Sequence, residues 1–182
     1  MSKKVVKENK VKKLLIMGLD KSGKSSVFLS LKGIRNLMSF YSLNPTRGIK
    51  REKISVFGSD FHVWDLGGQE QFRKEYLANF NNNIIGTNKI IFVIDIQDEE
   101  RYYLALKYLL GIVDKLQELN YIIDFSIFFH KYDPDIEMVN KKFDPMKANA
   151  FIEEIKNNMP KNFKYKLAKT SIYTIFQKTN IH

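Results

Sequence analysis

Short apolar runs recur along the chain, and each is followed by a polar or glycine-containing stretch. Six of them predict β-strands, at residues 11–19, 49–57, 61–66, 89–95, 125–129 and 165–168. The runs at 89–95 (KIIFVID) and 125–129 (FSIFF) are nearly continuous, which is typical of parallel strands buried on both faces. Gly58-Ser59-Asp60 separates the second run from the third and predicts a hairpin, so one strand is expected to be antiparallel.

Helical patterns lie between these runs. Residues 24–32 end at Gly33, residues 146–159 form another helical segment, and a longer helix begins near Asp98 as its cap. The longer helix carries an apolar stripe at helical spacing, made of Leu106, Leu109, Leu110, Val113 and Leu116. Residues 34–48 and 67–86 have no steady period and predict irregular loops. Strands that alternate with helices predict an α/β fold with a mainly parallel six-stranded sheet, one antiparallel edge strand and helices on both faces.

Composition narrows the class of protein. The length of 182 residues suits one domain, placed at 11–182 with an apparently truncated end, after a basic flexible arm at 1–10. The lack of cysteine excludes disulfides, thiolate metal sites and lipidation through cysteine, and Ser2 excludes N-myristoylation. The sequence shows neither an 18-residue apolar run nor a signal peptide, so we expect a cytoplasmic protein.

The formal net charge is +10, with lysines concentrated in residues 1–13 and 156–178. Aromatic residues do not alternate with the N-terminal lysines as they would in a single-strand binder, so we expect no specific nucleic acid partner. A lysine-rich solvated surface explains most of this charge. Weak contact with an anionic membrane, at a peripheral position, stays open.

The sequence GLDKSGKSS directly follows the first apolar run. Its glycine, lysine and serine positions match G-x-x-x-x-G-K-[ST], the phosphate-binding P-loop. Glycine lets backbone N–H groups approach phosphate oxygens, the lysine attracts the β- and γ-phosphates, and the serine hydroxyl can bind Mg²⁺. The predicted phosphate-binding residues are Gly18, Asp20, Lys21, Ser22, Gly23, Lys24, Ser25 and Ser26.

WDLGGQE closes the third predicted strand. Asp65 can hold Mg²⁺ through water, Gly68 can offer its N–H to a γ-phosphate, and Gln69 can orient a hydrolytic water. An ordinary turn at the end of a strand explains the same residues equally well when they are taken alone.

HKYD follows the run FSIFF. The carboxylate of Asp133 can accept two hydrogen bonds from guanine N1 and N2, a pair that adenine does not offer. The aliphatic stem of Lys131 can cover one face of the base. No second histidine or cysteine lies near His130 in sequence, so we expect it to make a structural hydrogen bond and not to bind a metal.

Five motifs in this order, GLDKSGKS, PTRG, WDLGGQE, HKYD and KTSIY, resemble those of the small GTPases of the Ras superfamily over about residues 11–175. The first three are similar to the Arf and Gα branch, and the last two to the Rag/Gtr branch. The absence of cysteine and the many lysines and asparagines suggest an archaeal type. The resemblance implies the P-loop NTPase small-GTPase fold, GTP and GDP as substrate and product, and Mg²⁺ as cofactor.

The resemblance also implies a role for each matching residue. Gln69 takes the catalytic role. Mg²⁺ would be held by Ser25, by Thr46 and, through water, by Asp65. The guanine-binding residues would be His130, Lys131, Asp133, Ser171 and Ile172. Switch I would lie around 36–48 and switch II around 67–82.

Some positions depart from the family pattern. His130 stands where asparagine is usual, a replacement normal in Rag-like members, so the tie between this loop and the P-loop is an open question. Trp64 matches one position of an Arf aromatic trio, and Phe72, Tyr76 and Phe80 either rebuild an apolar patch or pack in the core. Arg47 follows the switch I threonine instead of preceding it, which disfavours an intrinsic arginine finger.

We therefore expect a GTP/GDP switch with slow intrinsic hydrolysis, which contacts effector, activating and exchange proteins through its switch regions. A dimer through switch or interswitch surfaces stays open. The alternatives are a guanine-nucleotide-binding interaction module with little hydrolysis, and another P-loop enzyme such as a small-molecule kinase. The kinase is disfavoured because the sequence shows no inserted lid.

Overall fold

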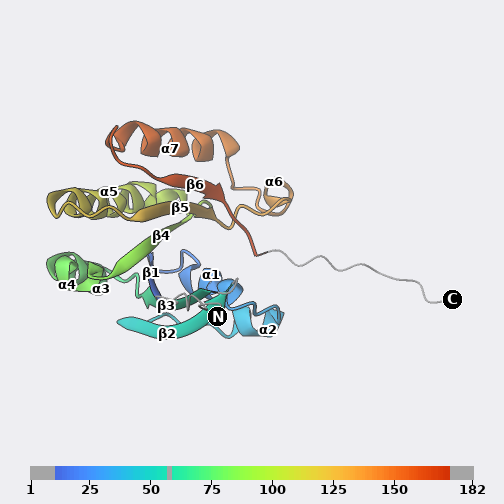
Figure 1. The fold of residues 1–182 in the computed structure, drawn as a ribbon. Coiled ribbons are helices and arrows are strands. Elements are labelled where there is room, and N and C mark those ends of the chain that lie inside the picture. The colour runs from blue at the N-terminus through green and yellow to red at the C-terminus, as the bar shows by residue number, and fades with distance from the viewer. Residues whose placement is uncertain (1–10, 57–58, 173–182) are drawn as a thin grey trace, which may run out of the picture.

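A computed structural model describes residues 11–56 and 59–172 (Figure 1). The expected basic arm at 1–10 and the end of the chain from 173 lie outside the described residues. The strands are β1 (Lys12–Met17), β2 (Ile49–Val56), β3 (Ser59–Leu66), β4 (Thr87–Asp95), β5 (Asp124–His130) and β6 (Lys166–Lys169). They form one six-stranded sheet in the order β2-β3-β1-β4-β5-β6. Only the β2–β3 pair of this sheet is antiparallel, which confirms the predicted fold class.

Three helices occupy the predicted places. They are α1 (Lys24–Leu31), α5 (Tyr102–Glu118) and α7 (Pro145–Asn158). The other helical elements are α2 (Leu37–Tyr41), α3 (Glu70–Ala78), α4 (Phe80–Ile84), α6 (Ile136–Val139) and the 3-10 turn η1 (Glu99–Arg101). Helix α7 and strand β6 lie at one edge of the molecule, and β2 lies at the other (Figure 1).

Two predicted loops are partly helical, so those predictions were wrong. In the first, the side chain of Asn36 accepts a hydrogen bond from the Met38 N–H at 3.0 Å and caps α2. The second contains α3 and α4. Helix α3 buries only Arg73 and Tyr76, so it lacks the wide apolar stripe from which a helix is recognised.

The predicted cap of the long helix was also wrong. Asp98 precedes η1 and makes no side-chain cap hydrogen bond. Its carboxylate instead accepts a hydrogen bond from Arg101 Nε at 2.6 Å. The arginine is thereby held at the start of α5, a position that matters for the site.

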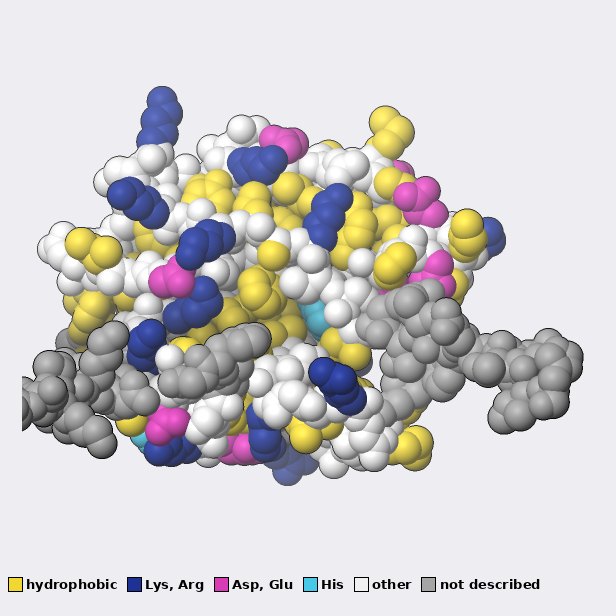
Figure 2. Space-filling view, turned by 45° about the vertical axis from the view of Figure 1, so that its right-hand side comes forward, with side chains coloured by type: hydrophobic (Ala, Val, Ile, Leu, Met, Phe, Trp, Pro, Cys, Tyr) yellow, Lys and Arg dark blue, Asp and Glu magenta, His cyan; other side chains and the backbone are white. Residues whose placement is uncertain are grey.

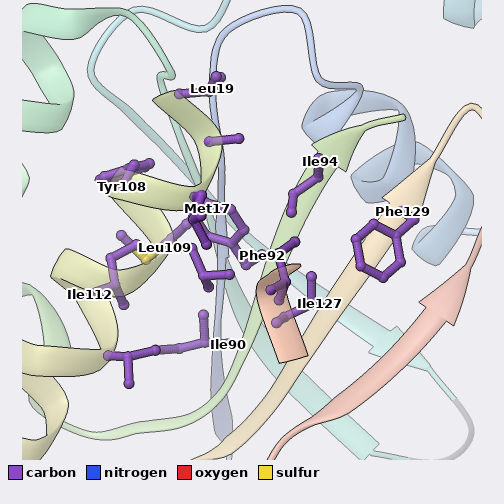
Figure 3. Packing of buried hydrophobic residues seen from close by; sticks show 14 of the residues in the cluster. Met17, Leu19, Ile90, Phe92, Ile94, Tyr108, Leu109, Ile112, Ile127 and Phe129 are labelled. Atoms are coloured by element: carbon purple, nitrogen blue, oxygen red, sulfur yellow. The ribbon is translucent and has the colours of Figure 1, made fainter. Parts of the chain in front are cut away.

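The sheet is packed on both faces. The larger core joins β1, β4 and β5 to α5, and Figure 3 shows Tyr108, Leu109 and Ile112 directed from α5 toward Met17 and Ile90. The smaller core lies on the other face and is covered by α1. It contains Leu14, Ile16, Val27, Phe28, Ile54, Val63, Ile91 and Val93. Helices therefore lie on both faces, as predicted.

The aromatic residues of the switch II region pack inward. Tyr76 and Phe80 are buried in the larger core, and Phe72 packs against it. These three side chains therefore pack in or against the core and do not form an exposed apolar patch.

The face of the described region drawn in Figure 2 carries hydrophobic side chains and charged side chains of both signs. Lysine and arginine side chains are interspersed with acidic ones over the face in Figure 2. Among the described helices, none combines the length and apolar character needed to cross a bilayer.

Candidate functional site

The P-loop connects β1 to α1 and holds a buried cation. Lys24 begins α1, is 5% exposed, and donates a hydrogen bond from Nζ to the Leu19 carbonyl oxygen at 2.6 Å. Burial lowers the pKa of Lys24 to about 8, although the nearby carboxylates of Asp65 and Asp20 oppose this shift. An anion bound in the loop would favour the charged form of the amine further.

Three side chains predicted to hold Mg²⁺ meet in a hydrogen-bonded triangle. Ser25 Oγ donates to Asp65 Oδ2 at 2.6 Å, and Thr46 Oγ1 donates to the same oxygen at 3.0 Å. The two hydroxyl oxygens are 3.0 Å apart. Burial raises the pKa of Asp65, and the hydrogen bond from Ser25 opposes it. The triangle joins α1, the segment before β2 and the end of β3, which are distant in sequence.

This oxygen donor set fits a hard divalent cation. Asp65 is 1% exposed, and its Oδ1 has no hydrogen-bond partner within the described residues. Mg²⁺ prefers octahedral oxygen ligands and is usually held by few protein groups together with waters and substrate phosphates. The described residues contain no cluster of three or more His, Cys, Asp or Glu that could hold a metal.

Gly68 lies against the P-loop, and Gln69 lines the same cleft as the P-loop residues. A Cβ atom on Gly68 would be 2.1 Å from the backbone nitrogen of Asp20, so no residue with a side chain fits there. Gln69 occupies the N-cap position of α3, and its buried Oε1 has no hydrogen-bond partner in the part of the chain described. From the same helix, Tyr76 donates its hydroxyl to the Gly48 carbonyl oxygen at 2.7 Å. The 67–82 segment is thereby tied to the end of the 36–48 segment.

The predicted base-recognition loop follows β5. Lys131 Nζ lies 2.5 Å from Asp95 Oδ2. Asp133 accepts hydrogen bonds from the Ser171 hydroxyl and, at 3.3 Å, from Gln97 Nε2. The loop and the last motif are thus held together around one carboxylate.

His130 ties this loop to the P-loop by packing. A Cβ atom on Gly23 would be 2.3 Å from His130 Cδ2, and Gly23 has a φ of +91°, so glycine is required on both counts. His130 Nδ1 lies 3.0 Å from Thr170 Oγ1, the structural hydrogen bond that its sequence context predicts. Burial lowers the pKa of His130, which favours the neutral ring.

A cleft of about 490 Å³ brings most of the predicted residues together. It is lined by Asp20, Lys21, Gly23, Lys24, Ser25, Ser26, Thr46, Gly68, Gln69 and Lys131, among others. Ser22 does not line it, because its side chain is buried with Oγ unpartnered among the described residues. Gly18 lies behind it at the end of β1, against the Val93 carbonyl. Ser171 and Ile172 line a neighbouring cavity.

Two residues that contact the site were missed from the sequence. Arg101 donates from Nη1 to the Asp20 carboxylate at 3.0 Å and from Nη2 to the Asp20 carbonyl at 3.2 Å. Gln97 donates to the Lys131 carbonyl at 2.8 Å as well as to Asp133. In the sequence, only Asp20 indicated that a residue such as Arg101 should be present. A carboxylate in a phosphate-binding loop repels the phosphate unless a cation lies beside it.

The chain is similar to known proteins over much of its length. The profile of the Gtr1/RagA G protein conserved region matches residues 13–177. Ras-related GTP-binding protein D of Mus musculus is 36% identical over 124 residues, which cover 66% of this chain and 26% of the mouse protein. ADP-ribosylation factor 1 of Brassica rapa subsp. pekinensis is 31% identical over 125 residues, which cover 69% of this chain and 63% of the plant protein. The chain thus spans less than two thirds of either relative.

Solved structures show the same fold. The small GTPase Arl6 BBS3 of Trypanosoma brucei, solved with the nucleotide analogue GppNp, aligns with a TM-score of 0.62 at 18% identity. That alignment covers 88% of this chain and 87% of the trypanosome chain. The mammalian SRP receptor aligns with a TM-score of 0.62 at 17% identity, over 88% of this chain and 92% of the receptor chain. Because a family profile matches most of the sequence, the chain belongs to the Gtr1/RagA family of G proteins, within the small GTPases of the Ras superfamily.

Proposed function

We propose that the protein is a molecular switch that hydrolyses GTP to GDP and phosphate with Mg²⁺. The observation that carries this proposal is the triangle of Ser25, Thr46 and Asp65, with distances of 2.6 to 3.0 Å. It places one hydroxyl from the P-loop and one from switch I on the same carboxylate. A ligand that enters the triangle therefore acts on both segments at once.

Each part of the cleft has a distinct role in the proposal. Lys24 neutralises charge on the β- and γ-phosphates, and Ser25 and Thr46 supply hydroxyl oxygens to the metal. Mg²⁺, when bound, would supply charge neutralisation across the β- and γ-phosphate oxygens. Gly68 donates its N–H to the γ-phosphate, and Gln69 orients the attacking water. The buried and unpartnered Oε1 of Gln69 supports that role, because a water could satisfy it.

Switching follows from loss of the third phosphate. While it is present, it bridges the P-loop to Thr46 and Gly68 and orders residues 36–48 and 67–82. After hydrolysis those contacts end and both segments relax, which changes the surface offered to effector, activating and exchange proteins. Asp133 selects guanine, with Ser171 and Gln97 holding its carboxylate in place.

Nucleotide-binding and turnover measurements test the proposal. GDP and GTP should bind far more tightly than ATP, and GTP should be converted slowly to GDP and phosphate. Gln69→Leu should slow hydrolysis at least about tenfold and leave the affinity for GTP near wild type.

Each contrary outcome selects an alternative. Equal affinity for ATP and GTP would point to another P-loop enzyme. Tight GTP binding with no turnover would leave a nucleotide-binding interaction module. An unchanged rate in the Gln69→Leu variant would remove Gln69 from the water-positioning role.

A further inference from the structure

A second groove lies on the same sheet, around the side chain of Trp64. Its volume is about 530 Å³, and it is lined by Lys13, Arg51, His62, Trp64, Asn82 and Ile85. The first four residues come from three adjacent strands, since Arg51 pairs with Trp64 across β2–β3 and Lys13 pairs with His62 across β1–β3. None of these residues lines the nucleotide cleft.

Two cations flank the Trp64 ring. Lys13 Nζ lies 3.7 Å from the ring centroid, and Arg51 Cζ lies 4.2 Å from it. They belong to β1 and β2, the strands on opposite sides of β3, so the indole lies between them. Each contact is a cation–π interaction, which holds a positive charge over the face of the indole.

The groove has an excess of positive charge. The Arg51 side chain is exposed, and within the described residues its guanidinium contacts the Trp64 ring but makes no ion pair or hydrogen bond. Lys13 Nζ donates to the backbone carbonyls of Asn83 and Ile85 at 2.6 and 3.0 Å, not to an acid. Burial and the nearby charge of Arg51 lower the pKa of Lys13 to about 8, the result expected when two cations are held together.

Two acidic residues of the β2–β3 hairpin are engaged with other side chains. Asp60 accepts hydrogen bonds from Lys53 at 2.8 Å and from Ser55 at 2.6 Å. Glu52 pairs with Lys32 at 2.6 Å and with Lys50 at 2.9 Å. Neither carboxylate compensates Arg51.

We propose that this groove binds an acidic segment of a partner protein, with a glutamate or aspartate on Arg51 and an apolar side chain against Ile85. The guanidinium is planar and can bind a carboxylate through two parallel N–H···O bonds. Ile85 is 58% exposed at the rim, which suits a partner with apolar side chains next to its acidic ones. The added negative charge would also favour the protonated form of Lys13.

Two other anionic surfaces fit less well. A single-stranded nucleic acid would stack bases on an open aromatic face, but the faces of Trp64 are flanked by Lys13 and Arg51. A membrane surface would attract projecting lysines, whereas Lys13 is half-buried and bonded to backbone carbonyls.

Trp64 makes the test direct, because it is the one tryptophan of the whole chain. The probe is the capped hexapeptide Glu-Leu-Glu-Glu-Leu-Glu, titrated into the full chain while tryptophan fluorescence is recorded. We expect a saturable change that the matching lysine peptide does not produce. The Arg51→Ala substitution should lower the affinity for the acidic peptide about tenfold. The matched control Lys156→Ala removes one charge from α7, at the opposite edge of the sheet, and should change affinity less than about twofold.

Three results would overturn the proposal. One is an equal affinity of the wild type and of Arg51→Ala for the acidic peptide, measured by tryptophan fluorescence, when Arg51→Ala and Lys156→Ala both unfold at the wild-type temperature. Another is a response to phosphatidylserine vesicles or to an oligo-dT strand with none to the acidic peptide. The third is a concentration-dependent dimer, lost in Arg51→Glu, that excludes the peptide. The groove is separate from the nucleotide cleft, so each result can be read whether or not the protein hydrolyses GTP.

Discussion

At the scale of single residues, the most informative group is the amine of Lys24. It is almost fully buried, yet its described hydrogen bond is to a carbonyl and not to a carboxylate. Burial disfavours the charged form and lowers the pKa of Lys24 to about 8 in the nucleotide-free protein. A phosphate placed in the loop would raise the pKa again. The binding of nucleotide and the binding of a proton should therefore be linked.

This linkage predicts how affinity depends on pH. Because the pKa of Lys24 is about 8 in the free protein and higher with phosphate bound, affinity should be full below pH 8. The affinity for GDP should fall as the pH rises above 8, by up to about tenfold per pH unit. Dissociation constants for GDP with Mg²⁺ between pH 7 and 9.5 measure it directly.

A matched pair of variants identifies the titrating group. The Lys24→Met variant should bind GDP weakly at every pH, and its affinity should not fall further above pH 8. Lys13 also has a pKa lowered to about 8 but lies outside the cleft, so Lys13→Met should keep the wild-type profile. A wild-type affinity that stays constant from pH 7 to 9.5 would contradict the linkage.

At the scale of elements, the turn η1 supports the P-loop through one side chain. Arg101 holds the carboxylate and the carbonyl of Asp20 and is itself held by Asp98. Asp20 lines the nucleotide cleft, and its backbone nitrogen lies against Gly68, the proposed donor to the γ-phosphate. Without a cation beside it, the carboxylate would repel the phosphate placed there.

Removal of this cation should affect the triphosphate most. Arg101→Ala should weaken the binding of GTP about fivefold to tenfold and the binding of GDP much less, because Gly68, the proposed donor to the γ-phosphate, lies against Asp20. Asp20→Asn combined with Arg101→Ala should restore most of the loss, and fluorescent-nucleotide titrations of all four proteins complete the cycle. Equal losses for GTP and GDP, or no rescue in the double variant, would show that Arg101 has only a structural role.

The elements also show what sequence can and cannot predict. The strands were found because β4 and β5 are apolar on both faces, and α5 because its stripe repeats at helical spacing. Helix α3 was missed because it buries so little, and the glycines before it and the asparagines after it indicated a loop. The short α2 has only five residues, too few for a period to appear.

Some residues of the candidate site could be predicted from the sequence and others could not. Its motif residues have fixed spacing, so Lys24, Ser25 and Asp133 could be named from the sequence. Arg101 lies 81 positions from Asp20, and Gln97 lies 36 from Asp133. Contacts at such separations depend on how strands are ordered in the sheet, which no local pattern encodes.

At the scale of the whole molecule, the sheet and α5 form the packed core, and the proposed switch I, residues 36–48, has few described contacts with the rest of the chain. The larger core contains fully buried residues from β1, β4, β5 and α5. Switch I contributes a five-residue helix and is joined to the rest through the Thr46 and Gly48 contacts. A ligand that bridges these segments should therefore stabilise the fold as a whole, since it binds the folded chain and not the unfolded one.

Thermal unfolding should report this bridging and its dependence on the third phosphate. At a concentration about 100-fold above its dissociation constant, GDP with Mg²⁺ should add about 2.7 kcal/mol, which raises Tm by about 5–10 °C. A non-hydrolysable GTP analogue at the same multiple of its own dissociation constant should give a similar rise and, in addition, protect residues 36–48 and 67–82 from hydrogen exchange. Thr46→Ala should keep the GDP shift but lose the extra protection. An equal Tm shift with ATP at matched concentration would contradict guanine selection, and identical exchange with GDP and the analogue would contradict a switch.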